Sequence, residues 1–181
     1  MKVQPLTLDN APLSVRQYFS SSTGPLVGTL AQVPELLQVA MPFIAQSFGA
    51  SALSMRHKEM IILLVSVLQG CRYCTQTHTV VAFNEGLSTT ELASIRTGQP
   101  QGFAPKEQAL VDFVIVMGAG ILDKQKVDQV MTLLTEHWLD FEVVEISMLI
   151  GTVIMLNRYC IALDLPTSET HLQWLENEGW L

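Results

Sequence analysis

The stretch that decides the fold spans residues 55–78 and reads MRHKEMIILLVSVLQGCRYCTQTH. Its first part predicts a helix over 54–69, in which residues 60–65 are apolar on every side. A helix of that kind is buried all round. Gly70 then predicts a C-terminal cap, and the next residues predict a second helix over 71–84. The stretch therefore predicts two consecutive helices, the first of them in the core.

The rest of the chain shows the same helical spacing of apolar residues, with no strand-like alternation and no low-complexity segment. Residues 1–24 are expected to be irregular, with a short helix near 14–19 and a loop at 20–24. We therefore expect one all-α domain over residues 1–181, built as a multi-helix bundle. The further helices are predicted over 33–48 (kinked or broken near Pro42), 88–97 (with Ser88 and Glu91 in a capping box), 106–117, 124–137, 140–163 and 168–179.

Moving the sequence by 86 residues aligns two of its own segments. The shift places Glu59 on Glu145, and the tripeptide at 72–74 on the identical tripeptide at 158–160. An internal duplication of a helix pair explains this match, with a second copy that lacks the paired cysteines. A chance match of three residues explains it equally well.

The composition limits the kind of partner. The chain has 181 residues, of which 49% are hydrophobic and 15% charged, so it can bury a substantial core. Its formal charge of −7, without a basic cluster, argues against nucleic acid and anionic membranes as partners. The first ten residues lack the apolar core of a signal peptide, so we expect a cytoplasmic protein.

The high apolar content also bears on assembly. The most apolar stretch covers residues 146–156, which is shorter than the roughly 20 residues of a membrane span. We therefore expect a buried core helix there. Because monomers rarely expose large apolar patches, we also expect some helix faces to be covered in a homo-oligomer.

The cysteines point to redox chemistry. Two of the three cysteines form the C-x-x-C of Cys71 and Cys74, which in a reducing compartment is more often catalytic or metal-binding than structural. Helical spacing places Cys71, Cys74 and His78 on one face. The expected Cα separation of the two cysteines is about 5 Å on a helix, within the range that a disulfide accepts.

The neighbouring groups fit thiol activation. Cys71 and Cys74 fall in the first turn of their helix, where unpaired amides favour a thiolate. His78 lies one turn beyond Cys74 and can take the thiol proton. Glu59 is expected in the buried helix, where a carboxylate needs a partner, and His78 is the candidate. This arrangement follows the order of nucleophile, base and orienting group.

Other interpretations remain open. Cys, His and Glu could instead form a structural zinc site, although such sites usually take their second ligand pair from a separate turn. Tyr73 either lines a substrate entrance or is a packing residue. Cys160 lies in an apolar helix and is expected to be an inert buried thiol. The remaining histidines, His57, His137 and His171, are expected at the surface.

The pattern Glu-x11-Cys-x2-Cys-x3-His after an apolar helix resembles the alkylhydroperoxidase D-like branch of the carboxymuconolactone decarboxylase family. The resemblance is best over 54–86 and extends to LNRYCIALDLP at 156–166. It implies an all-helical fold that assembles as trimers or hexamers. It also implies peroxide reduction, in which Cys74 becomes a sulfenic acid and Cys71 then resolves it as a disulfide.

The resemblance also implies roles for Glu59 and His78, and it leaves more than one possible function. Glu59 and His78 match the family's proton relay, whereas Tyr73 stands where other members carry a histidine. The decarboxylases of the family lack the cysteine pair, so the lactone reaction is not expected. No cofactor is expected, and an external dithiol supplies the electrons. The alternatives are a disulfide reductase that serves a partner peroxidase and a non-enzymatic redox sensor or zinc-stabilised oligomer.

Overall fold

The computed structural model describes residues 1–20 and 23–181, and these residues form helices and loops without any strand. The expected all-α class is confirmed. In chain order the elements are the 3-10 helix η1 (Leu13–Tyr18) and the α-helices α1 (Pro25–Leu30), α2 (Pro34–Phe48), α3 (Met55–Leu68), α4 (Arg72–Asn84), α5 (Thr89–Arg96), α6 (Pro105–Met117), α7 (Lys124–His137), α8 (Asp140–Leu163) and α9 (Glu169–Asn177).

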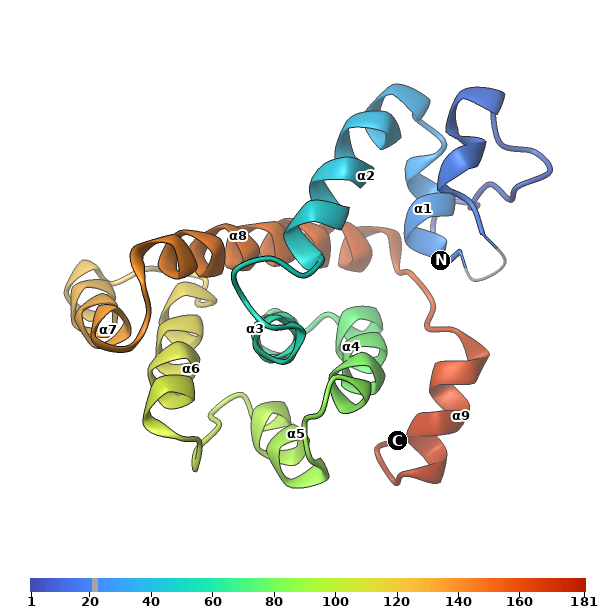
Figure 1. The fold of residues 1–181 in the computed structure, drawn as a ribbon. Coiled ribbons are helices and arrows are strands. Elements are labelled where there is room, and N and C mark those ends of the chain that lie inside the picture. Colours follow the sequence, from blue (N-terminus) through green and yellow to red (C-terminus); the bar gives the residue numbers. More distant parts are fainter. Residues whose placement is uncertain (21–22) are drawn as a thin grey trace.

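Helix α3 lies at the centre of the molecule, where Figure 1 shows it end-on, and α4, α5, α6 and α8 pack around it. All residues from Lys58 to Ser66 are buried, as expected for a helix that is apolar on every side. Each fully buried Leu or Ile contributes about 1.5–3 kcal/mol. The apolar run at 60–65 is therefore the main element of the core.

Side-chain caps mark three of the predicted helix starts. Ser54 accepts a hydrogen bond from the backbone N–H of His57 and so begins α3. At the start of α5, Ser88 accepts from the backbone of Glu91, and the Glu91 carboxylate accepts from the backbone N–H of Ser88. Ser168 caps α9. These caps explain why the starts of the three helices could be read from the sequence.

The N-terminal part forms a second apolar cluster, centred on Val15, Leu37 and Ile44. The expected short helix near 14–19 is present as η1, whereas α1 was not predicted. Helix α1 has only six residues, too few for a periodic apolar pattern to show. The predicted helix over 33–48 is present as α2, which continues through Pro42 and is therefore not broken there. The loop predicted at 20–24 includes residues 21–22, which lie outside the described part of the chain.

The suggested duplication of a helix pair is not present. In the first copy, Gly70 adopts a left-handed conformation with φ of 68° and separates α3 from α4. The residue 86 positions later is Leu156, which lies inside the continuous helix α8. A bulky L-residue does not favour the left-handed turn that ends α3. The matching tripeptide at 158–160 therefore belongs to one long helix and not to the second member of a helix pair.

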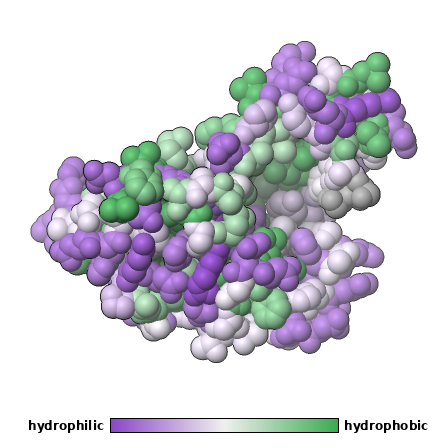
Figure 2. Space-filling model, in the orientation of Figure 1, coloured by the Kyte–Doolittle hydropathy of each residue, from purple (hydrophilic) through white to green (hydrophobic). Residues whose placement is uncertain are grey.

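Helix α8 is the only helix in the described residues that is long and apolar enough to cross a membrane, judged by length and composition alone. The expected buried core helix at 146–156 is present, but it is buried on one face only. One face packs on α3, while the other exposes apolar side chains such as Phe141, Met148 and Met155. Helix α2 likewise exposes Val39 and Phe43. Figure 2, in the orientation of Figure 1, shows hydrophobic residues at several places on an otherwise largely hydrophilic surface.

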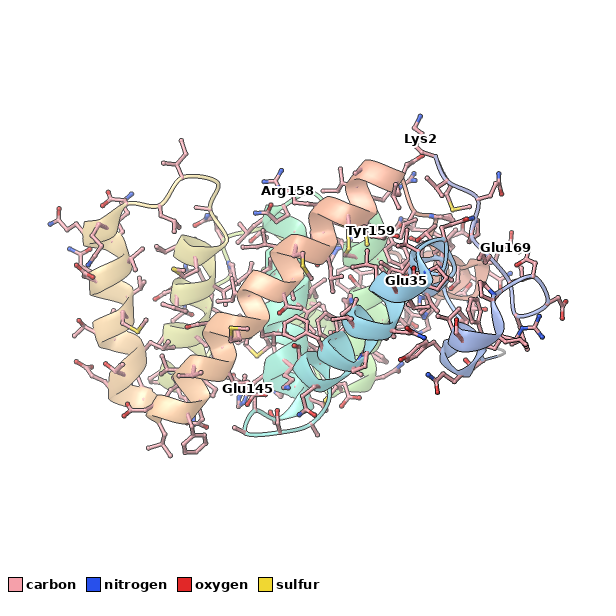
Figure 3. The ribbon with its side chains drawn as sticks, turned by 90° about the horizontal axis from the view of Figure 1, so that it is seen from above. Lys2, Glu35, Glu145, Arg158, Tyr159 and Glu169 are labelled. Atoms are coloured by element: carbon pink, nitrogen blue, oxygen red, sulfur yellow. A yellow bond between two sulfur atoms is a disulfide. The ribbon has the colours of Figure 1, made fainter. Side chains whose placement is uncertain are left out.

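An ion pair joins α3 to α8 beside the loop that connects α2 and α3. The fully buried Lys58 places Nζ 2.6 Å from Oε1 of Glu145, and the same ammonium group donates to the backbone carbonyls of Ser47 and Gly49. Glu145 also accepts from the backbone N–H of Ala52 at 3.0 Å. Figure 3 shows Glu145 beside this loop. The pair therefore fixes how α3 enters the core.

Candidate active site

The site begins at the junction of α3 and α4. The left-handed Gly70 turns the chain, and the backbone N–H of Cys71 donates to the carbonyl of Ser66 at 3.0 Å. Cys71 is the N-cap of α4, and its Sγ accepts a hydrogen bond from the backbone N–H of Cys74 at 3.3 Å. A sulfur atom therefore occupies the place that a serine oxygen usually takes at a helix N-terminus.

Cys71 and Cys74 form a disulfide, with their Cα atoms 5.3 Å apart. This separation matches the value expected for two helical residues three positions apart. The residues are 1% and 6% exposed, so solvent reaches the pair only through small openings. Because both sulfurs lie at the first turn of α4, the unpaired amides there stabilise a thiolate after reduction.

A carboxylate on α3 and an imidazole on α4, the helix that carries the cysteine pair, form a second polar pair. Nδ1 of His78 on α4 lies 2.8 Å from Oε2 of Glu59 on α3. Glu59 is buried, whereas the His78 side chain is 19% exposed and its ring lies against Phe48 with the centroids 6.0 Å apart. Within the described chain, Nε2 of His78 has no hydrogen-bond partner. The carboxylate therefore holds one ring nitrogen and leaves the other available for proton exchange.

The third cysteine also reaches this site. Cys160 on α8 is buried, as expected, but its Sγ lies in one cluster with those of Cys71 and Cys74, all within 4.8 Å of one another. Burial raises the pKa of the Cys160 thiol to about 12, so the thiol stays protonated at neutral pH. The sequence shows that Cys160 lies on an apolar helix, but it does not show which helix faces it.

Tyr73 lies over the same cluster. Burial, with a smaller contribution from Cys160, raises its pKa to about 12. The phenol is therefore neutral over the physiological range. Together with Cys71 and Cys160, Tyr73 lines a cavity of about 160 Å³. Cys74 does not line this cavity.

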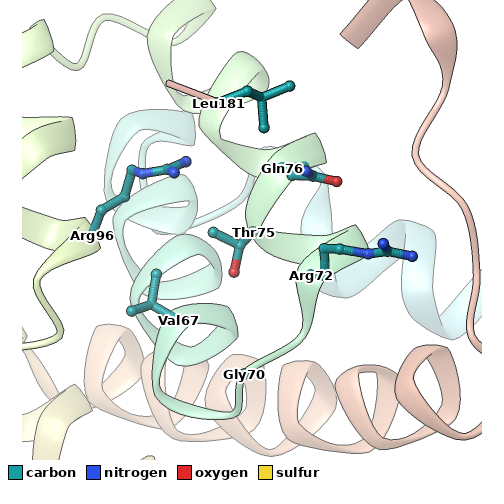
Figure 4. Close-up of a pocket in the computed structure, with 7 residues that line it drawn as sticks. All are labelled: Val67, Gly70, Arg72, Thr75, Gln76, Arg96 and Leu181. Atoms are coloured by element: carbon teal, nitrogen blue, oxygen red, sulfur yellow. The ribbon is translucent and has the colours of Figure 1, made fainter. Parts of the chain in front are cut away.

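A larger cavity of about 310 Å³ lies on another side of α4. Figure 4 shows Thr75 near its centre, between Arg96 of α5 and Arg72 at the start of α4. The Arg72 side chain points away from Arg96 in this view and is 70% exposed, with Asp164 at 3.5 Å. None of the three cysteines lines this cavity, so we do not place the thiol chemistry there.

The other histidines only partly follow the sequence-based expectation. His137 is exposed, as predicted. The prediction is wrong for His57, whose ring packs edge-on against Trp138 with centroids 4.9 Å apart. It is also wrong for His171, which is partly buried. Burial, and to a smaller extent the charge of His78, lowers the pKa of His171. Sequence spacing missed these contacts because they join helices that are distant in the chain.

Residues 34–115 match the model of the carboxymuconolactone decarboxylase family. The matched segment contains Glu59, both paired cysteines and His78. It includes the stretch 54–86, where the resemblance in sequence is best, but it does not include 156–166. No curated protein matches the sequence significantly.

Solved structures confirm the alkylhydroperoxidase D-like fold. The alkylhydroperoxidase core of an uncharacterized peroxidase-related protein from Ralstonia eutropha JMP134 superposes with a TM-score of 0.79 at 16% identity, covering 94% of this chain and 93% of that one. The debrominase Bmp8 gives 0.77 at 19% identity, covering 95% of each chain. A putative antioxidant defence protein from Agrobacterium tumefaciens gives 0.70 at 23% identity, covering 77% and 94%.

Proposed function

We propose that the protein is a thiol-dependent peroxidase that reduces hydrogen peroxide or alkyl hydroperoxides through Cys71 and Cys74. The observation that carries this proposal is the buried Glu59–His78 pair, 2.8 Å long, on the helices that also position the cysteine pair. The family of residues 34–115 includes enzymes, and two similar structures are described as peroxidase-related or antioxidant proteins.

The reaction begins at Cys74, which is one helical turn from His78. Its thiolate attacks one peroxide oxygen, so that an S–O bond forms while the O–O bond breaks. The departing alkoxide takes a proton from His78 and leaves as an alcohol. Glu59 holds the imidazole in position and stabilises its charged form. The product at Cys74 is a sulfenic acid.

The second step closes the disulfide. The Cys71 thiol attacks the sulfenic sulfur, the S–S bond forms, and the hydroxyl group leaves as water with the thiol proton. An external dithiol then reduces the disulfide by exchange. The cavity beside Tyr73 reaches Cys71 but not Cys74, so the reductant enters at Cys71. In this proposal Tyr73 lines the entrance.

The test is peroxide consumption with a small dithiol as reductant. Cys74→Ser is expected to abolish turnover, and His78→Ala is expected to lower it about 10²-fold to 10⁴-fold, as for the loss of a general acid or base. His137→Ala serves as the matched control, because His137 is exposed and far from the sulfurs in sequence. Wild-type turnover by Cys74→Ser would remove the proposed nucleophile.

A disulfide reductase that supplies a partner peroxidase is the second candidate, because the Cys71–Cys74 disulfide is the oxidised form that such a reductase would also produce. Direct peroxide turnover would then be weak, while a disulfide substrate would still be reduced. Because the fold also occurs in a debrominase, a bromopyrrole is a useful third substrate. Stoichiometric zinc in the purified, reduced protein would instead favour a metal-stabilised oligomer or a redox sensor.

We also propose that the protein is a cytoplasmic homo-oligomer. The exposed apolar faces of α2 and α8 support a homo-oligomer, a trimer or a hexamer, because a monomer rarely leaves large apolar patches in water. Cytoplasmic location follows from the need for a reducing compartment that keeps the dithiol cycle running. Native mass measurement tests the assembly.

A further inference from the structure

Helix α8 carries a thiol that the two-cysteine mechanism does not use. Cys160 is 3% exposed, and its Sγ lies within 4.8 Å of the sulfurs of both Cys71 and Cys74. The three residues form an apolar cluster of their own with Leu165, distinct from the main core. Cys160 therefore lies within a few ångströms of both sulfurs of the disulfide, in a position where a thiol can react with either of them.

The distances allow Cys160 to form a covalent bond within the cluster. A disulfide needs its two sulfurs about 2.05 Å apart, so the Cys160 sulfur, now within 4.8 Å of the Cys74 sulfur, must move closer before the bond forms. Rotation about the Cα–Cβ bond moves a sulfur between well-separated staggered positions. The cavity beside Tyr73, of about 160 Å³, is lined by both Cys71 and Cys160, and it gives these sulfurs room to move.

We propose that Cys160 is a second resolving thiol, which condenses with the sulfenic acid of Cys74 when Cys71 is not available. In this step the Cys160 sulfur attacks the Cys74 sulfur, an S–S bond forms and the S–O bond breaks. The hydroxyl group leaves as water with the Cys160 proton. The sulfenic sulfur is reduced and the thiol sulfur is oxidised, so no further oxidant or reductant is needed. This inference rests on the proposed function.

The environments of the two thiols set the order of resolution. Cys71 lies on the same helical turn as Cys74 and accepts a backbone hydrogen bond, which favours its thiolate. Burial raises the pKa of Cys160 to about 12, so its thiolate is scarce and its attack is slower. Cys160 therefore acts as a reserve that protects Cys74 from further oxidation to the sulfinic acid, which most cells cannot reverse.

The test uses the Cys71→Ser variant. Serine is a preferred N-cap residue, and its oxygen can accept the hydrogen bond that the Cys71 sulfur now accepts, so the variant is expected to fold. The variant is treated with one equivalent of hydrogen peroxide, quenched in acid with dimedone present, and mapped by mass spectrometry without reduction. The expected product is a peptide pair joined by a Cys74–Cys160 disulfide, with the loss of two thiols.

The matched control is the double variant Cys71→Ser, Cys160→Ala. Here Cys74 has no resolving thiol, so the dimedone adduct and the sulfinic acid at Cys74 are expected to accumulate. If Cys71→Ser itself gives dimedone-labelled Cys74 while Cys160 is recovered as a free thiol, the inference is overturned and the proposed peroxidase chemistry stands. If peroxide oxidises Cys74 in neither these variants nor the wild type, the proposed function fails and the inference falls with it.

Discussion

The carboxylate of Glu59 and the imidazole of His78 meet at 2.8 Å, although the two residues are 19 positions apart and belong to different helices. The turn at Gly70 makes this contact possible, because it folds α4 back along α3. The same turn places Cys71 at the N-terminus of α4. One left-handed residue therefore positions the thiol pair, the imidazole and the carboxylate together.

Glu59→Gln is expected to lower peroxide turnover by about 10²-fold, at the lower end of what general acid–base catalysis contributes. Glutamine keeps the size of the side chain but cannot stabilise a charged imidazole. The thiol titre should stay unchanged, because neither cysteine contacts the substituted oxygen. Initial rates with saturating dithiol check this, and Glu85→Gln, at an exposed position of α4's C-cap, is the control. Equal rates in both variants would exclude Glu59 from the mechanism.

Lys58→Met is expected to lower the free energy of unfolding by about 3 kcal/mol, because it leaves the Glu145 carboxylate without its ammonium partner. The double variant Lys58→Met, Glu145→Gln should recover part of this loss, since no unpaired charge then remains. Urea unfolding of the two variants measures the difference. If the single variant changes the free energy of unfolding by less than about 0.5 kcal/mol, the pair contributes no more to stability than an ordinary surface interaction.

The pH dependence of the Lys58–Glu145 pair has a defined sign. Burial alone would raise the pKa of Glu145, but the hydrogen bonds from Lys58 and Ser51 outweigh it and lower the pKa below its ordinary value. A carboxyl group whose pKa is lower in the folded state stabilises the fold above its unfolded pKa. We therefore expect the destabilisation by Lys58→Met, measured by urea unfolding, to be largest at neutral pH and to shrink in acid.

Local signals in the sequence explain why so much of the helical pattern could be predicted. Ser88 with Glu91 marks a helix start, Gly70 marks a helix end, and the spacing of Cys71, Cys74 and His78 places them on one face. Each of these features depends on residues within two turns of one another. Such short-range signals can be recognised in the sequence without any knowledge of the tertiary contacts.

The contacts between distant helices could not be predicted in the same way. Cys160 lies close to the cysteine pair because α8 packs against α4. The residues next to Cys160 in the sequence do not indicate this contact. Lys58 is a charged residue at the start of an apolar helix, yet it is fully buried. Its burial depends on Glu145, which lies in the longest helix. Helix packing, and not local propensity, decides these positions.

The exposed faces of α2 and α8 give a prediction on assembly. If these faces form contacts between copies of the chain, Met148→Glu should disrupt the oligomer, because a charge buried in an apolar interface is costly. Native mass spectrometry is expected to show smaller assemblies for this variant. Thr132→Glu, at an exposed position on α7, should leave the mass unchanged. An unchanged mass in Met148→Glu would mean that α8 faces water in the assembled protein.

Acid stability provides a separate test at the start of α5. A hydrogen bond from Arg56 is the main cause that lowers the pKa of Glu91 from 4.5 to about 2, and the capping contacts with Ser88 add to the effect. Since the folded pKa is the lower one, the Glu91 charge stabilises the fold above pH 4.5 and loses its effect as the pH falls towards 2. Glu91→Gln removes the charge but can keep the capping box, because glutamine accepts the same backbone hydrogen bond. We expect the variant to be less stable than the wild type at neutral pH, and the difference in urea unfolding to shrink between pH 4.5 and 2. A difference that stays constant over this range would show that the Arg56 contact does not perturb the carboxyl group, and that Glu91 acts only as a cap.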